Sequence, residues 1–218
     1  MRRIALFVVL LFLCPLQTHA ADRPADAFPL RNHNAFLQVY GLPTFQTAEL
    51  VAPGGLDFNV SIDIANDADD ADREGETLII DSECRVINLS LRRRFSERVE
   101  FGLDVPYVNH SAGFLDGLIY DFHDLVGLSN SSREGPNDEF RLLFGQGETT
   151  YFDMMSPQSG IGDVQVSAAM RFGRMTLRTG VKLPTGDPDK LTGSGAADFS
   201  IGAYGTGTTT FFDRDLSY

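Results

Sequence analysis

The stretch LDFNVSIDI, residues 56–64, alternates apolar and polar side chains without interruption. The apolar members are Leu56, Phe58, Val60, Ile62 and Ile64, and the polar members are Asp57, Asn59, Ser61 and Asp63. Side chains point alternately to the two faces of a β-strand. This period therefore predicts a sheet with one apolar and one polar face.

The same two-residue period marks two predicted hairpins farther along the chain. Their strands are residues 87–95 and 99–107 around a turn at 96–98, and residues 164–172 and 175–183 around Gly173 and Arg174. Glycine tolerates the positive φ that a two-residue hairpin turn requires. Further strand candidates are residues 140–144, 149–155 and 198–205. About eight strands are therefore expected.

The connections between these strands lead to three further predictions. The acidic run at residues 66–76 indicates a solvated loop, because its spacing lacks the glycine of an EF-hand. Leu78 and Ile80 have the opposite parity to the strand that follows them, which predicts a bulge or turn within residues 81–84. If the two tight turns lie at the same end of the sheet, an even number of strands must separate the hairpins. The candidates at 140–144 and 149–155 supply that pair.

The chain divides into three expected parts. Arg2 and Arg3 precede ten apolar residues, 4–13, and small residues near Ala20 offer a cleavage point, which predicts a signal peptide over residues 1–20. Ten helical residues span about 15 Å, half of a hydrocarbon core of about 30 Å, which argues against a membrane anchor. Residues 21–55 form an irregular N-terminal segment interrupted by Pro and Gly, and residues 56–218 form the β-domain.

Charge and cysteine content exclude several classes of protein. The sequence has 18 Lys and Arg residues against 30 Asp and Glu, a formal charge of −12, and loss of the two signal arginines makes it −14. Nucleic acid is therefore not expected as a partner. After cleavage Cys84 is the one cysteine left, so no intrachain disulfide can form. Four histidines, one of them in the signal, provide no zinc signature, and no metal or cofactor is expected.

Export, two-faced strands and alternating short and long connections favour an all-β fold, an antiparallel transmembrane β-barrel of the cell outer membrane. A soluble β-sandwich stays open as the alternative, because it also hides one face of each strand. In the barrel, the apolar face contacts outer-membrane lipid and the polar face lines the interior. The charged candidates for that interior are Asp57, Asp63, Arg92, Glu100, Asp104, Asp163, Arg171, Arg178 and Lys182. Either a narrow pore or a salt-bridged plug fits this set.

The segment from residue 110 to 133 combines an amphipathic pattern with potential catalytic groups. Apolar residues from Phe114 to Val126 recur at helical spacing and predict a short helix in a long outer loop. The catalytic candidates are His110, Ser111, His123 and Asp124. Each pair is adjacent in sequence, and neighbours on a strand point to opposite faces, so an enzyme is the less favoured interpretation.

Three functions follow from this reading. The leading hypothesis is a pore or transport barrel for an unidentified small solute. The alternatives are an outer-membrane hydrolase that uses the 110–124 loop and a structural or adhesive barrel without transport.

Several motifs resemble those of a family of Gram-negative outer-membrane barrels catalogued as domain of unknown function 3187. They are Arg31, Asn32, Asn34, Phe36, Leu37, Gln38 and Gly41–Pro43; His110, Ser111 and Gly113–Gly117; His123, Asp124, Gly127 and Leu128; Gly160 and Gly162–Val164; and Lys182–Asp187. The resemblance covers Pro29 to Asp198, implies a membrane barrel and supplies no catalytic residue.

This sequence differs from that family in two respects. Ala112 stands where a glycine is usual. Members of the family also continue beyond the end of this chain, so we expect a barrel that is incomplete at its C-terminus, with further strands needed to close the sheet.

Overall fold

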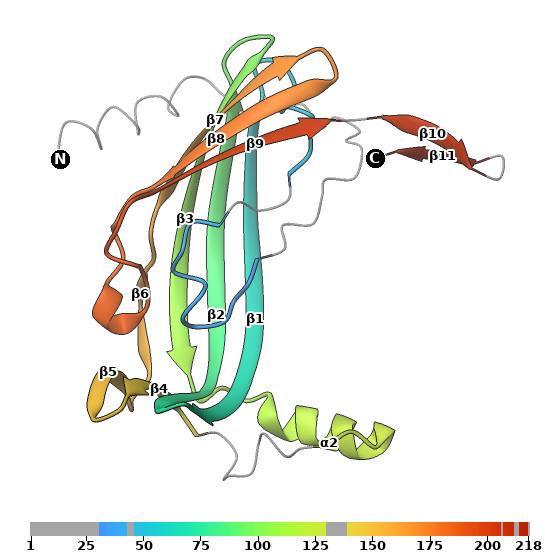
Figure 1. Cartoon of the computed structure of the whole chain (residues 1–218). Coiled ribbons are helices and arrows are strands. Elements are labelled where there is room, and N and C mark those ends of the chain that lie inside the picture. The colour runs from blue at the N-terminus through green and yellow to red at the C-terminus, as the bar shows by residue number, and fades with distance from the viewer. Residues whose placement is uncertain (1–30, 43–45, 130–138, 206, 212–213, 218) are drawn as a thin grey trace.

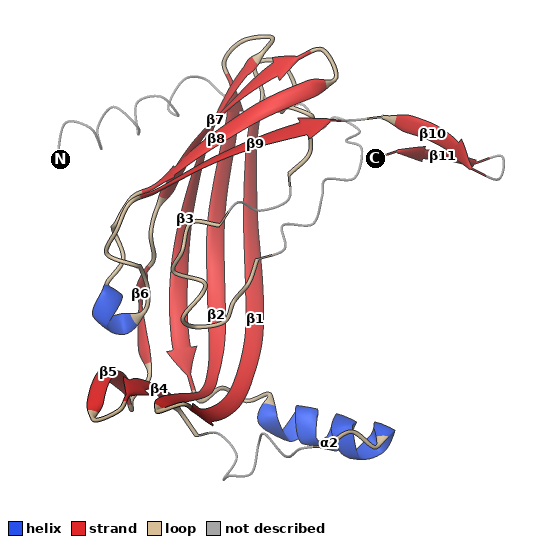
Figure 2. Ribbon diagram, viewed as in Figure 1, coloured by secondary structure: helices blue, strands red, loops and turns tan. Residues whose placement is uncertain are grey.

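The computed structural model describes residues 31–42, 46–129, 139–205, 207–211 and 214–217. An antiparallel nine-stranded sheet dominates and curls into a half-barrel (Figure 1; Figure 2). Its strands are β1 (Leu56–Arg73), β2 (Glu76–Arg94), β3 (Val99–Ser111), β4 (Arg141–Gln146), β5 (Thr149–Met154), β6 (Gln158–Ile161), β7 (Gln165–Phe172), β8 (Met175–Lys182) and β9 (Asp198–Gly205). Also described are the helix α2 (Asp116–Val126), the 3₁₀ turn η2 (Pro188–Lys190) and a hairpin of β10 (Thr208–Phe211) and β11 (Arg214–Ser217).

These elements confirm the prediction of a mainly antiparallel β chain with one short helix. The predicted signal peptide, residues 1–20, lies outside the described residues. The described part of the N-terminal segment, residues 31–42 and 46–55, contains no helix or strand. Among the described residues, no helix has the length and apolar character needed to cross a membrane.

The main sheet runs in the order β1, β2, β3, β7, β8, β9. Both predicted tight turns, β2 to β3 and β7 to β8, lie at the same end of the sheet (Figure 1). They are tied together there, since the Arg171 amide donates to the Arg98 carbonyl at 2.8 Å. Within the described residues, the outer edges of β1 and β9 have no strand partner, so the sheet is open.

The β1–β2 hairpin corrects two predictions. The acidic run at residues 66–76 is not a loop, because β1 continues to Arg73 and pairs residue by residue with β2. The turn is only Glu74 and Gly75, whose φ values of 54° and 82° suit a tight hairpin. The acidic residues join the sheet because backbone pairing with the Ile-rich start of β2 does not depend on their side chains.

The predicted bulge at residues 81–84 is also absent, since β2 pairs with β1 in unbroken register from Glu76 to Arg94. Leu78 and Ile80 therefore lie on the same face as the polar residues farther along β2. At this end the inner face is apolar, because Ile80 packs in a core with Ala35, Leu142 and Met154. The alternation of side chains along β2 is therefore unbroken. The surroundings of its inner face change from apolar near Ile80 to polar farther along the strand.

The two predicted strands near residues 140–155 exist as β4 and β5, but they do not separate the hairpins. β3 covers β2 only from Glu83 to Arg94, and β4 pairs with the remaining part, Glu76–Asp81. β3 pairs directly with β7, and beyond it with the short β6, which sequence analysis did not predict. A β2 that is longer than its partner makes this branching possible.

The two faces of the sheet differ sharply. Large apolar side chains on the outer face are exposed, and they are Phe58, Val60, Ile62, Ile64, Ile87, Leu89, Phe101, Tyr107, Met170, Phe172, Met175, Leu177, Val181, Phe199 and Ile201. The inner face holds buried polar and charged groups, including Asn88, Glu100, Asp104 and Lys182. The apolar residues of α2 are exposed as well, with Leu125 83% accessible.

The turn between β1 and β2 provides a test of this hairpin. Gly75→Ala should lower the free energy of unfolding by about 1 kcal/mol, because an L-residue with a side chain is disfavoured at positive φ. A Cβ at Gly75 would meet no atom within 4 Å, so the effect is confined to the backbone. The measurement is a urea titration followed by circular dichroism.

Gly160→Ala is the matched control, since its Cβ would make only an ordinary contact of 3.6 Å with Thr192. We expect a change within about 0.5 kcal/mol there. Equal midpoints for the wild type and Gly75→Ala would contradict the tight turn.

Candidate functional site

The N-terminal segment lies along the inner face of the half-barrel and is held there mainly through its backbone. The amide of Val51 donates to Glu100 Oε2 at 2.7 Å. Arg178 donates to the carbonyls of Thr47 at 3.1 Å and Glu49 at 2.9 Å, and Thr176 donates to the carbonyl of Ala48. The curled sheet and this segment together enclose the candidate site.

Arg178 also pairs with Glu100 across an intervening strand. Glu100 on β3 lies beside Ala169 on β7, which lies beside Arg178 on β8. Because Ala169 is small and the sheet is concave, the guanidinium reaches Glu100 Oε1 at 2.8 Å. Both side chains are at least 88% buried, so each neutralises the other in a site largely shielded from water.

Arg92 and Asp104 form a second inner-face pair. Arg92 Nη2 contacts the two carboxylate oxygens of Asp104 at 3.0 and 2.8 Å. Gly102 makes room for the arginine, since a Cβ there would approach Arg92 Cδ to 2.8 Å. A third pair, Arg171 with Glu49 at 2.7 Å, joins β7 to the N-terminal segment and is about one-third exposed.

Lys182 and Asp163 form the most deeply buried ion pair among the described residues. Lys182 Nζ contacts Asp163 Oδ2 at 2.6 Å and Asp198 Oδ2 at 2.9 Å, and it donates to the Val39 carbonyl at 2.9 Å. Lys182 and Asp163 side chains are only 3% and 4% exposed. Lys182 also donates to the hydroxyl of Ser194.

Asp163 is satisfied by backbone donors as well. The amides of Gly186 and Ser194 donate to it at 2.9 and 3.0 Å. Thr185 Oγ1 donates to the Gly162 carbonyl and accepts from the Val164 amide, both at 2.8 Å. The motifs at Gly160–Val164 and Lys182–Asp187 therefore interlock around one ion pair, which fixes the long β8–β9 connection to the sheet.

The other two charged candidates, Asp57 and Asp63, lie on β1. Asp63 Oδ2 is 3.8 Å from His33 Nε2 in the N-terminal segment. Burial lowers the pKa of His33, and Asp63 opposes that shift. His33 is therefore neutral at pH 7, and any stability that its neutral form contributes is lost as the pH falls below about 6.5.

The structure does not bring His110 and Ser111 together. His110 is fully buried on the inner face, where Nε2 lies 3.1 Å from Gln38 Nε2 and 3.0 Å from the Leu191 carbonyl. Ser111 Oγ accepts instead from Arg85 Nη2 at 3.2 Å. The side chains diverge as neighbours on a strand must, so the pair is no base and nucleophile.

His123 and Asp124 lie on α2, which projects from the far end of the sheet (Figure 1). His123 is half-buried and Asp124 is exposed. Among the described residues, no group of three or more His, Cys, Asp or Glu side chains is arranged to hold a metal ion.

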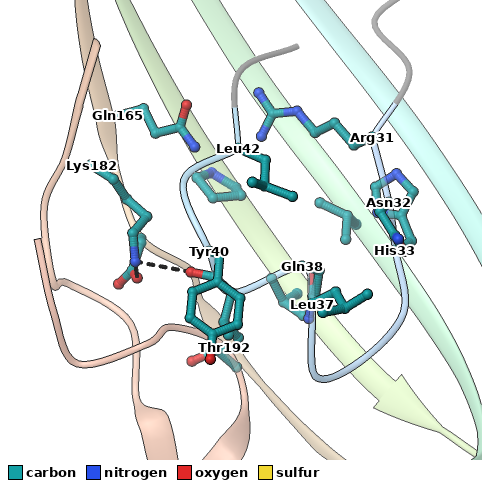
Figure 3. Close-up of a pocket in the computed structure, with 15 residues that line it drawn as sticks. Arg31, Asn32, His33, Leu37, Gln38, Tyr40, Leu42, Gln165, Lys182 and Thr192 are labelled. Carbon is teal, nitrogen blue, oxygen red and sulfur yellow. Dashed lines mark hydrogen bonds and ion pairs between the residues drawn. The ribbon is translucent and has the colours of Figure 1, made fainter. Parts of the chain in front are cut away.

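A cavity of about 170 Å³ lies between the N-terminal segment and the sheet. Figure 3 shows its lining, with Gln165 and Lys182 on one side, Arg31 on the opposite side, and Leu37 and Thr192 below them. A second cavity of about 40 Å³ adjoins the β7–β9 surface. Arg31 and Gln165 line both cavities, which therefore meet at these two side chains.

Sequence reasoning missed several members of this interior. Glu49, Arg31 and Gln38 come from a segment without periodicity, so no pattern predicted which face they meet. Asp198 could have been found, because it begins a predicted strand on the polar parity. On the outer face, the buried Glu83, 2.8 Å from Arg85, was also missed, because a bulge was wrongly predicted at its position.

Comparison with known proteins yields one match. The model of a protein family, described as "Protein of unknown function (DUF3187)", matches residues 4–214. No curated protein and no solved structure matches the chain.

The Lys182 ion pair leads to a prediction about stability. Lys182→Met should lower the free energy of unfolding by about 3 kcal/mol, because it leaves the buried Asp163 carboxylate without its cation. The measurement is a denaturant titration of the refolded chain, followed by circular dichroism.

Arg171→Met is the matched control, because its pair with Glu49 is about one-third exposed, and we expect a cost of at most about 1 kcal/mol. Similar losses for the two variants would show that burial of the Lys182 pair does not determine its contribution.

Proposed function

The chain belongs to the DUF3187 family, and we propose that it is an outer-membrane β-barrel whose polar interior binds and passes a small solute. The observation that carries this proposal is the sidedness of the sheet. Its outer face is apolar and exposed, while its inner face is charged, paired and buried. A protein in water has the opposite arrangement, with apolar side chains directed to the core.

The outer face argues against a β-sandwich. In a sandwich, the apolar faces of two sheets pack on each other about 10 Å apart. Within the described residues, nothing covers the outer row on β1, where Phe58 is 61% and Ile62 is 66% exposed. Contiguous apolar surface of this kind marks a site of contact with lipid or another protein. Lipid is the occupant we propose, since the row continues across β2, β3, β7, β8 and β9.

The pattern of connections and the N-terminal sequence agree with this location. The turns from β2 to β3 and from β7 to β8 lie at one end of the sheet, and the long connections from β3 to β4 and from β8 to β9 lie at the other, a distribution typical of bacterial outer-membrane barrels. The tight β1–β2 turn is the exception, because it lies at the end of the long connections. Export by the predicted signal peptide, residues 1–20, would bring the chain to that membrane. Strands beyond the open half-barrel would close the sheet in the lipid, where unpaired backbone groups are costly.

The arrangement of the interior is consistent with passage of a solute, and the N-terminal segment would regulate that passage. The segment occupies the inner face, and the two adjoining cavities mark the space left between it and the sheet. Its attachment is mainly through polar side chains of β3 and β8, so it acts as a plug that can shift. A structural or adhesive barrel is the alternative, and conductance separates the two.

Lipid contact can be tested on neighbouring residues of β1. In a Cys84→Ala background, a fluorophore on Ile62→Cys should be quenched by brominated phospholipid, because Ile62 is on the outer face. The same label on Asp63→Cys should be quenched far less, since Asp63 is on the inner face. Equal quenching at the two positions, or none at either, would overturn the proposed membrane orientation.

Conductance in planar bilayers tests passage and the plug. The full-length protein should give channel events, and Arg178→Gln should raise their mean conductance or frequency at least about twofold, because charge loss weakens the contacts with Glu100, Thr47 and Glu49. Arg174→Gln, at an exposed turn position, is the control and should behave as the wild type. Absence of channel events from the wild type would remove the pore and leave the structural barrel.

A further inference from the structure

Arg31 and Gln165 are the two residues shared by both interior cavities. Among the described residues, neither side chain forms a hydrogen bond or an ion pair. Figure 3 shows the Arg31 guanidinium extended across the cavity toward the side of Gln165. Arg31 is half-buried and lines both cavities.

The other lysine, arginine and aspartate side chains that line the cavities are already in ion pairs. Lys182 and Asp163 pair with each other at 2.6 Å. Asp104 pairs with Arg92 at 2.8 Å, and Arg178 pairs with Glu100 at 2.8 Å. His33 is uncharged at neutral pH because burial lowers its pKa. Among the described residues that line the two cavities, Arg31 is therefore the one cationic side chain without an ion-pair partner.

The larger cavity also has an apolar wall, beside polar lining residues such as Asn32, Gln38 and Thr192. This wall consists of Leu37, Leu42, Val86, Pro106 and Val108. A cavity of about 150 Å³ in another protein accommodates benzene. A volume of about 170 Å³ therefore suits one six-membered ring or a short alkyl chain. A few convergent polar groups above an apolar wall are typical of a small-molecule site.

We propose that Arg31 and Gln165 bind the carboxylate of a small organic acid, the size of benzoate, whose apolar part fills the cavity beside Val86 and Val108. The guanidinium and the amide together supply donors that match the two oxygens of a carboxylate. This inference rests on the proposed function and identifies the class of solute that enters the interior.

The test is calorimetric titration of the refolded full chain in detergent micelles with benzoate. Wild type should bind with a dissociation constant on the order of 1 mM. Arg31→Gln should weaken binding about ten- to a hundredfold, because it removes the charge and the forked donors. Gln165→Leu should cost a smaller factor, about three- to tenfold, and Arg31→Lys should retain more affinity than Arg31→Gln.

Two other titrants and one other variant serve as controls. Benzamide, which keeps the ring and lacks the charge, should bind at least about tenfold more weakly than benzoate. Acetate should also bind more weakly, since it leaves the apolar wall unfilled. Arg98→Gln, an exposed arginine at the tight-turn end, should bind benzoate as the wild type does. Circular dichroism establishes that each variant is folded.

Equal affinity of benzoate for the wild type, Arg31→Gln and Gln165→Leu would overturn the site, as would benzamide binding as tightly as benzoate. The titration requires no membrane passage, so its result is independent of conductance. Channel events without benzoate binding would refute this inference alone. Benzoate binding without channel events would support the site and refute passage.

Discussion

An ionised side chain that leaves water without a partner costs several kcal/mol, and the inner face of this half-barrel is arranged around that cost. Arg92 with Asp104, Arg178 with Glu100, and Lys182 with Asp163 each join one positive and one negative group at 2.6–2.8 Å. The partners in these pairs are 12, 78 and 19 positions apart in the sequence. Each depends on the curvature and register that bring the strands together.

The same pairs position the N-terminal segment. Glu100 and Arg178 bind one another and also bind backbone groups of residues 47–51, while Lys182 binds the carbonyl of Val39. A segment without helix or strand has many backbone groups that need partners, and the charged inner face supplies them. The proposed plug is therefore held by polar contacts that a change in charge would weaken, whereas apolar packing predominates only at the long-connection end, around Ile80 and Leu142.

Small residues control where these groups can meet. Ala169 lies between Glu100 and Arg178, and Gly102 leaves space for Arg92. Gly193 lets the β8–β9 connection approach Asp163, since a Cβ there would lie 2.3 Å from its carboxylate. The inner face thus combines long charged side chains with positions that have almost none. This combination leaves room for two cavities in an interior whose charged side chains are otherwise in ion pairs.

The sequence by itself determined the strands, their two faces and the tight turns, because alternation and turn chemistry are local properties of the chain. It also identified the charged residues on the polar parity, and it separated His110 from Ser111 for the same reason. Composition was misleading for the acidic half of β1, where backbone pairing outweighs side-chain preference.

Only the tertiary structure decided which strands are neighbours, where β4 attaches, and which arginine meets which carboxylate. It also decided that Arg31 and Gln165 share two cavities. These features join residues from different parts of the chain, and the curvature of the sheet, which sets them, is not encoded in any short stretch of sequence.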